Sequence, residues 1–398
     1  VTLFEGDCMT SRSKIRRFTL AATLVALLVM ASPAIAGERI VAIGDIHGNY
    51  DGFVSILQRA GLVDEDVHWI GGTTTFVQTG DIFDRGLEVF EVIDLLMRLE
   101  QEAAEAGGEV IVLLGNHEGM NLVGFFRDVN PEIYARFVDK KSEKRRKAAF
   151  KNFKKYWLAK AEELLGQPVA GVPDDVKEQW MAAIPPGWLE YKEALSPDSH
   201  YGSWLHQLPV AVLIDGVLFI HAGVGPDLEG FSVDEINAKV ASELETYERL
   251  RQVMIDEGLV PMTAELASLT NVYLEMDPPD PKYSELADAD KWFVFSEGGP
   301  LWFRGGARWD EETEAEQIIG LLSGVGAERV VSGHTVQDEG RIQVRFDGRV
   351  FLIDTGMLSS VYTGGRPSAL VIEGGVFTAI YTDGSSEVLV DEALPDAA

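Results

Sequence analysis

The stretch Gly80-Asp81-Ile82-Phe83-Asp84-Arg85-Gly86 follows the segment Thr75-Phe76-Val77-Gln78-Thr79. A short segment of this kind that ends at glycine and aspartate is typical of a strand followed by a sharp turn. The turn places Asp81 at the carboxyl end of the strand, where binding residues of α/β proteins gather. This stretch therefore predicts a buried strand with a polar site at its end.

Four further polar clusters stand in the same position after an apolar run. They are Gly44-Asp45-Ile46-His47-Gly48, Gly115-Asn116-His117-Glu118, His221-Ala222-Gly223 and Gly333-His334-Thr335. Each supplies a carboxylate or amide oxygen or an imidazole nitrogen, which divalent and trivalent first-row metals accept as ligands. One such cluster is usually only a turn, but five in series predict a site for two metal ions.

The spacing of the first three clusters indicates the class of fold. Asp81 follows Asp45 by 36 residues, and Asn116 follows Asp81 by 35 residues. This distance fits successive strand–helix units of a parallel sheet. The intervening residues 50–60 and 87–106 have the apolar spacing of amphipathic helices, so we expect an α/β fold.

The rest of the chain predicts one domain with insertions. Residues 125–200 and 232–295 look mainly helical, whereas short strands return at residues 210–220 and 329–380. Because the predicted ligands span residues 45–334, they belong to one catalytic unit. We expect a single domain over residues 37–398 that carries two helical insertions.

Residues 1–36 have the layout of a secretory signal peptide. Four cations between residues 12 and 17 precede an apolar run at 18–31 and the small-residue site Ala34-Ile35-Ala36. The run is short for a membrane span, although a retained anchor is the alternative. We expect a periplasmic or secreted mature protein with no stable membrane insertion after cleavage.

Charge and cysteine content exclude several functions. The formal net charge is -30, so the electrostatic field repels polyanions and nucleic acid is not an expected partner. The single cysteine, Cys8, lies within the predicted signal peptide. The mature chain therefore has neither a thiolate zinc site nor a cysteine nucleophile.

A basic block at residues 140–155 contrasts with the acidic remainder. It is either a docking surface for an anionic substrate or partner, or a solvated helix face. The sequence leaves both interpretations open, and it leaves the oligomeric state open as well.

The motifs resemble those of a known family. The first three clusters have the forms GDxHG, GDxxDRG and GNHE, and two later histidines follow them. In this combination they resemble the calcineurin-like metallophosphoesterases and, within them, the phosphoprotein phosphatase group. Residues 201–205, 221–224, 299–304 and 332–337 are similar to the bacterial Shewanella-like protein phosphatases. The resemblance covers about residues 39–380 and implies two mixed β-sheets packed as a sandwich and flanked by helices.

The resemblance also implies a role for each candidate residue. Asp45 and His47 would bind the first metal, Asp81 would bridge, and Asn116, His221 and His334 would bind the second. His117 resembles the general acid, and Asp84 would orient it. Arg85, Arg304 and Asn116 would bind the substrate phosphate. Glu118 would hold the metal ligands in position without binding the metal itself.

The implied activity is hydrolysis of phosphomonoesters, in a phosphorylated protein or a small phosphate ester. A hydroxide held between two divalent or trivalent ions (Mn, Fe, Zn or Co) would attack the phosphorus. The alternatives are a phosphodiesterase or dinucleoside polyphosphate hydrolase and, in another class, a metal-binding protein without turnover.

Overall fold

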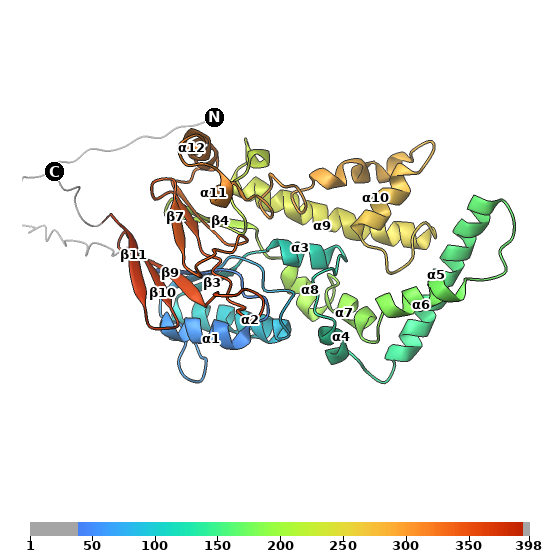
Figure 1. Cartoon of the computed structure of the whole chain (residues 1–398), viewed down its shortest axis with the longest axis horizontal. Coiled ribbons are helices and arrows are strands. Elements are labelled where there is room, and N and C mark those ends of the chain that lie inside the picture. Colours follow the sequence, from blue (N-terminus) through green and yellow to red (C-terminus); the bar gives the residue numbers. More distant parts are fainter. Residues whose placement is uncertain (1–38, 393–398) are drawn as a thin grey trace, which may run out of the picture. The chain divides into compact units, whose positions relative to one another are not determined.

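The computed structural model describes residues 39–392, in which two β-sheets are accompanied by helices (Figure 1). The predicted signal peptide at residues 1–36 lies outside the described residues. Within residues 39–392, no helix combines the length and the apolar character that crossing a bilayer requires.

The first sheet contains the strands that lead to the first three clusters. Its order is β11 (Ser386–Asp391), β10 (Val376–Tyr381), β9 (Ser368–Glu373), β1 (Ile40–Ile43), β2 (Thr75–Gln78) and β3 (Glu109–Val112). Strands β1, β2 and β3 are parallel, whereas β9, β10 and β11 each pair with their neighbours in antiparallel fashion. Strands β1 and β2 are buried along their whole length. Strand β1 is apolar throughout, whereas the buried Gln78 of β2 donates to the carbonyl oxygens of Gly44 and Gly80.

The second sheet leads to the two later histidines. Its order is β4 (Ala211–Ile214), β5 (Val217–Ile220), β6 (Arg329–Ser332), β8 (Val350–Leu352) and β7 (Gln343–Arg345). Strands β5, β6 and β8 are parallel, and the two edge strands are antiparallel. The turn Asp215-Gly216 joins β4 to β5 with positive φ at both residues, as a two-residue hairpin requires.

The two sheets pack face to face. One buried cluster joins Val77 and Leu370 of the first sheet to Phe219 and Phe351 of the second. Phe351 stacks on Phe377 with 4.7 Å between the ring centroids. The predicted α/β fold with two mixed sheets is thereby confirmed.

Helices cover the sheets and fill the long connections. Helices α1 (Tyr50–Arg59) and α2 (Val89–Ala106) follow β1 and β2, and α3 (Asn116–Leu122) follows β3. The connection to β4 holds α4 (Glu132–Arg136), α5 (Ser142–Leu165), α6 (Asp174–Ala183), α7 (Trp188–Ala194) and α8 (His200–Leu205). The connection from β5 to β6 holds η1 (Pro226–Leu228), α9 (Val233–Asp256), α10 (Leu266–Leu274), η2 (Pro281–Lys291), α11 (Gly305–Arg308) and α12 (Ala315–Gly324).

Strand β11 was not predicted from the sequence. It lies at the edge of the first sheet and pairs only with β10. Its side chains are exposed or half-buried, and its apolar run, Val388-Leu389-Val390, is only three residues long and is flanked by Glu387 and Asp391.

Candidate metal centre

The predicted clusters meet at one place because of the strand directions. They follow β1, β2, β3, β5 and β6, which are parallel strands within their own sheets. The carboxyl ends of parallel strands lie at the same edge of a sheet. The described side chains gathered there are all buried: Asp45, His47, Asp81, Asn116, His117, His221 and His334.

The backbone is strained at several of these residues. Positive φ occurs at nine described residues other than glycine, and five of the nine are predicted site residues. These five are His47, Asp81, Asp84, Arg85 and His334. Left-handed backbone in such residues persists only where the surrounding structure holds it, and it concentrates at functional sites.

Asp81 lies between two groups of imidazoles. Its Oδ1 is 3.3 Å from Nε2 of His221, and its Oδ2 is 3.8 Å from Nε2 of His47. The two carboxylate oxygens therefore face different sides of the centre. A carboxylate in this position can bind one ion with each oxygen.

The first side of the centre consists of Asp45 and His47. The Nδ1 atom of His47 is 2.8 Å from the carbonyl oxygen of Phe83, which makes this nitrogen the donor. The Nε2 atom then carries a lone pair and lies 4.0 Å from Oδ2 of Asp45. Fixing one ring nitrogen on a carbonyl is the usual way to aim the other at a metal.

The second side consists of Asn116, His221 and His334. The Oδ1 atom of Asn116 is 2.9 Å from Nε2 of His221 and 2.8 Å from Nδ1 of His334. Nδ1 of His221 is 2.8 Å from the carbonyl oxygen of Thr79, so its Nε2 is directed inward. The side chains of Asn116, His221 and His334, which are neutral, and Oδ1 of Asp81 thus surround a position where a second metal ion could bind.

Burial keeps the candidate ligand histidines neutral. It lowers the pKa of His47 to about 3, and it lowers the pKa of His221 and of His334 as well. Burial alone would raise the pKa of Asp81. The surrounding histidines outweigh this effect and lower the pKa, and His221 contributes most among them. Neutral imidazoles beside an ionised carboxylate are the protonation states that metal binding needs.

A third carboxylate, Asp354, was missed by the sequence analysis. It follows β8 and accepts a hydrogen bond from the backbone N–H of Gly356 at 3.0 Å. Burial raises the pKa of Asp354 to about 6. The pKa of Asp45 is raised too, mainly by burial and next by the negative charge of Asp354. The segment Asp354-Thr355-Gly356 after an apolar strand resembles the predicted clusters, so the signal was present.

Two buried polar atoms at the centre lack partners. Nε2 of His334 and Oδ2 of Asp354 form no hydrogen bond with any described residue. Unpaired buried polar atoms are costly, and so are neighbouring buried carboxylates. Oxygen and imidazole donors that crowd together in this way fit bound cations such as Mn, Fe, Zn or Co.

His117 lies beside the centre and belongs to a chain of hydrogen bonds. Its Nδ1 is 2.6 Å from Oδ2 of Asp84. Asn121 donates to Oδ1 of Asp84 at 2.9 Å, and the Tyr191 hydroxyl donates to Oδ1 of Asn121 at 2.6 Å. Burial alone would lower the pKa of His117, but the negative charges of Asp81 and Asp84 outweigh this effect and raise it.

Asn121 and Tyr191 were not predicted, because neither lies in a recognisable motif.

Two roles are open to His117 on geometry alone. Its Nε2 is 3.8 Å from Oδ2 of Asp81, close enough for His47, Asp81 and His117 to hold one ion. Its bond to Asp84 instead favours a protonated imidazole, which is an acid and not a ligand. The metal content of a His117 variant separates the two roles.

The two predicted arginines flank the centre. The Arg85 guanidinium contacts Nε2 of His47 and lies 5.4 Å from the ring centroid of Tyr362. Arg304 donates to the carbonyl oxygen of His334 at 3.1 Å and to Oγ1 of Thr335 at 3.0 Å. Both are only partly buried, so their planar forks can reach a phosphate group.

Glu118 holds the loop after β2 against α3. It accepts hydrogen bonds from the backbone N–H groups of Gly115, Asp81, Ile82 and Phe83 at 2.7–3.0 Å. These contacts fix the strained backbone that presents Asp81. Glu118 thereby holds the segment that carries Asp81, which is the supporting position that the family resemblance implies.

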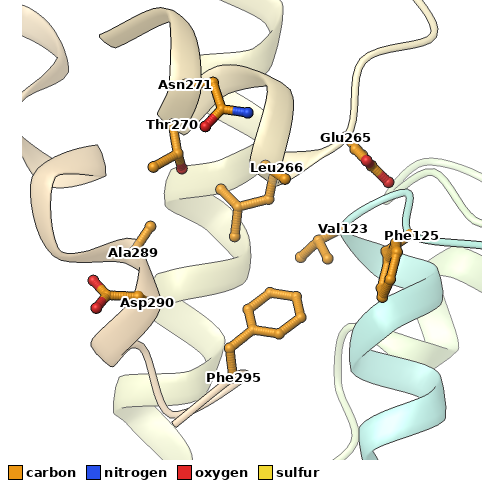
Figure 2. Close-up of a pocket in the computed structure, with 10 residues that line it drawn as sticks. Val123, Phe125, Glu265, Leu266, Thr270, Asn271, Ala289, Asp290 and Phe295 are labelled. Carbon is orange, nitrogen blue, oxygen red and sulfur yellow. The ribbon is translucent and has the colours of Figure 1, made fainter. Parts of the chain in front are cut away.

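A separate apolar cavity of about 280 Å³ lies at the other end of α3 (Figure 2). Val123 and Phe125 line it on one side, and Leu266 of α10 and Phe295 line it on the others. No predicted ligand or phosphate-binding residue lines this cavity. The metal centre is therefore distinct from it.

The fold and the buried Asp/His centre define a metallophosphoesterase. The chain belongs to the calcineurin-like phosphoesterase family, which it matches over residues 38–338. It is 26% identical over 333 residues to Shewanella-like protein phosphatase 1 of Plasmodium berghei (strain Anka), covering 83% of this chain and 69% of that protein. Over 92 residues it is 46% identical to Shewanella-like protein phosphatase 2 of Arabidopsis thaliana, covering 23% of this chain and 24% of that one.

A solved structure agrees with this assignment. The cold-active protein-tyrosine phosphatase of a psychrophile Shewanella sp. is 25% identical and has a TM-score of 0.57. The alignment covers 89% of this chain and 81% of that one. The predicted family is thus confirmed, and the protein is a metal-dependent phosphoester hydrolase of the protein phosphatase type.

Metal addition is expected to stabilise the metal-free protein. A cation relieves the repulsion among Asp45, Asp81 and Asp354, so at a concentration of 100 Kd it adds about 2.7 kcal/mol per site to the free energy of unfolding. Thermal unfolding of chelator-treated protein with added Mn²⁺, Zn²⁺ or Co²⁺ measures this. The variant H68N should respond equally, because His68 is exposed and pairs with Glu102 instead. An unchanged melting temperature with every metal would contradict the site.

Proposed function

We propose that this chain is an exported phosphatase that hydrolyses phosphate monoesters at a centre of two metal ions. The observation that carries the proposal is the position of Asp81, whose two oxygens face separate groups of buried donors. Two ions bound there would lower the pKa of a water molecule and polarise a phosphoryl oxygen. The residues around them then have distinct tasks.

His117 is assigned the task of protonating the leaving oxygen. The Asp84 carboxylate on Nδ1 fixes the ring orientation and supports the imidazolium, so the proton to be donated is on Nε2. Asn121 and Tyr191 hold Asp84 in turn. The leaving oxygen departs as a neutral hydroxyl group, which avoids an unstable alkoxide.

Arg85, Arg304 and Asn116 are assigned to the phosphate. Guanidinium groups form paired, charge-assisted hydrogen bonds with phosphate oxygens. When Oδ1 of Asn116 faces the metals, its NH₂ group remains for a phosphate oxygen. Two cationic forks suit the dianion of a monoester better than the single charge of a diester.

Phosphorylated proteins are the proposed substrates, with small phosphate esters as simple analogues. The names of the relatives support this choice, since they include two protein phosphatases and a protein-tyrosine phosphatase. Export rests on the signal-peptide pattern of residues 1–36. A secreted reporter fused to that segment tests export independently of catalysis.

The catalytic proposal predicts a preference for monoesters. Purified residues 37–398 with added Mn²⁺ should hydrolyse p-nitrophenyl phosphate at least about tenfold faster than bis(p-nitrophenyl) phosphate, because the second charge strengthens the arginine contacts. Initial rates at equal concentrations of substrate measure this ratio. A reversed ratio would indicate a phosphodiesterase, and absence of turnover with any metal would indicate a binding protein.

A further inference from the structure

Helix α5 is the main basic element of an acidic chain. Ten of the 34 Lys and Arg residues but only one of the 64 Asp and Glu residues lie between residues 140 and 160. This stretch carries a net charge of +9, while the whole chain carries -30. Figure 1 shows α5 beside α6 and away from the two sheets.

The two faces of α5 differ. Phe150 and Phe153 pack on Trp180 of α6, with ring centroids 5.2 and 5.8 Å apart, and Ala149 is buried on the same side. The lysine stripe occupies the opposite face and consists of Lys144, Lys147, Lys151, Lys154 and Lys155, all exposed. At 1.5 Å per residue the stripe is about 16 Å long.

The lysine stripe is not neutralised within the described chain. The ion pairs of α5 involve Arg145, Arg146 and Lys160 instead. Stripe lysines three or four positions apart repel one another, which destabilises the helix slightly. A bound partner with several negative charges would relieve that repulsion, so the stripe has the chemistry of a docking surface.

We infer that the lysine stripe docks an acidic segment of the phosphorylated protein substrate. The inference rests on the proposed phosphatase function and specifies its substrate class. A length of about 16 Å matches about five residues of extended chain, each of which can carry a carboxylate. Docking at α5 would retain the substrate through a surface that contributes no residue to the metal centre.

Charge and width favour a polypeptide over other polyanions. An anionic bilayer or a nucleic-acid duplex is broader than a single helix face, and it would also meet the acidic remainder of the chain. An extended peptide is narrow enough to contact the stripe alone. Because exposed ion pairs are individually weak, several must act together, and binding should weaken as salt rises.

The test compares two variants of residues 37–398 that lose four exposed cations each. One is K144Q/K147Q/K151Q/K154Q, and the control is R59Q/K282Q/K291Q/R341Q, whose positions are also exposed. The substrates are p-nitrophenyl phosphate and one phosphopeptide with a flanking run of either five Glu or five Gln residues. Binding of the unphosphorylated Glu peptide, measured by fluorescence anisotropy, tests docking without catalysis.

The stripe variant should lose about tenfold in kcat/KM on the Glu phosphopeptide and in affinity for the unphosphorylated Glu peptide. Its rates on p-nitrophenyl phosphate and the Gln phosphopeptide should match wild type, and the control variant should match wild type throughout. Equal losses in both variants, or none in the stripe variant, would overturn the inference. So would binding to vesicles of phosphatidylglycerol without binding to the peptide. If no protein hydrolyses p-nitrophenyl phosphate, the phosphatase function fails, while anisotropy still decides docking.

Discussion

Replacing Asp81 with Asn is expected to lower kcat/KM for p-nitrophenyl phosphate at least about a thousandfold, because metal catalysis needs ions that this carboxylate holds. Asn keeps the shape of the side chain but removes the charge and one of the two acceptor oxygens. The variant would then lack the charged carboxylate that links the His47 side of the centre to the His221 side. Metal content by mass spectrometry should fall together with turnover.

The fold of this variant should survive. Neutralising Asp81 reduces its repulsion with the buried carboxylates Asp45 and Asp354, but it also removes the attraction of the histidines that lowers its pKa. Asn keeps the Oδ1 that accepts from the backbone N–H of His117. The melting temperature without metal should therefore change little, whereas the rise on adding metal should disappear. The matched control is E100Q, a partly buried carboxylate that accepts from Trp204, which should keep full activity. Retention of two ions and normal turnover by D81N would contradict the bridging role.

Replacing His117 with Asn should lower kcat by about a hundredfold to ten-thousandfold on an alkyl phosphate such as phosphoserine, which is the usual range for a lost general acid. The loss should be smaller on p-nitrophenyl phosphate, because p-nitrophenolate departs readily without a proton. Steady-state kinetics with both substrates measure the difference. This dependence on the leaving group is the signature of an acid, which a merely structural residue would not show.

Metal content decides between the two roles that geometry allows for His117. As an acid it leaves the ions in place, so H117N should bind metal like wild type and lose only turnover. If His117 were a ligand to the ion beside His47 and Asp81, metal content and turnover would fall together. The control is H200N, since His200 is exposed and lies outside the centre.

The sequence was most informative where a strand is followed by a Gly-Asp pair. Strands β1 and β2 both lead to such a pair, and the structure has them at those positions, although β2 contains two polar residues. Strand β11 contains the short apolar run 388–390 but leads to no such turn, and it was not predicted. The turn after the strand was thus more informative than the apolar character of the strand itself.

The residues that support the centre were harder to predict than its candidate ligands. Asp354 repeats the strand-then-aspartate pattern and could have been found by it. Asn121, Tyr191 and Tyr362 could not, because each acts through a contact with a residue distant in the chain. The bond between Tyr191 and Asn121 joins positions 70 residues apart, and no local pattern encodes it.

The sequence by itself determined the set of polar clusters and the α/β pattern, because these depend on short-range spacing. The resemblance of those clusters to a known family then indicated the two-sheet fold. Only the tertiary structure decided that Asp81 turns one oxygen to each side of the centre. It also decided that the stripe lysines of α5 lie opposite its packed aromatic face, without an ion pair to any described residue. The physical reason is that side-chain direction and the pairing of charges depend on neighbours brought together by folding. For His334 and Asp45, those neighbours are 289 residues apart along the chain and in hydrogen-bond contact in the fold.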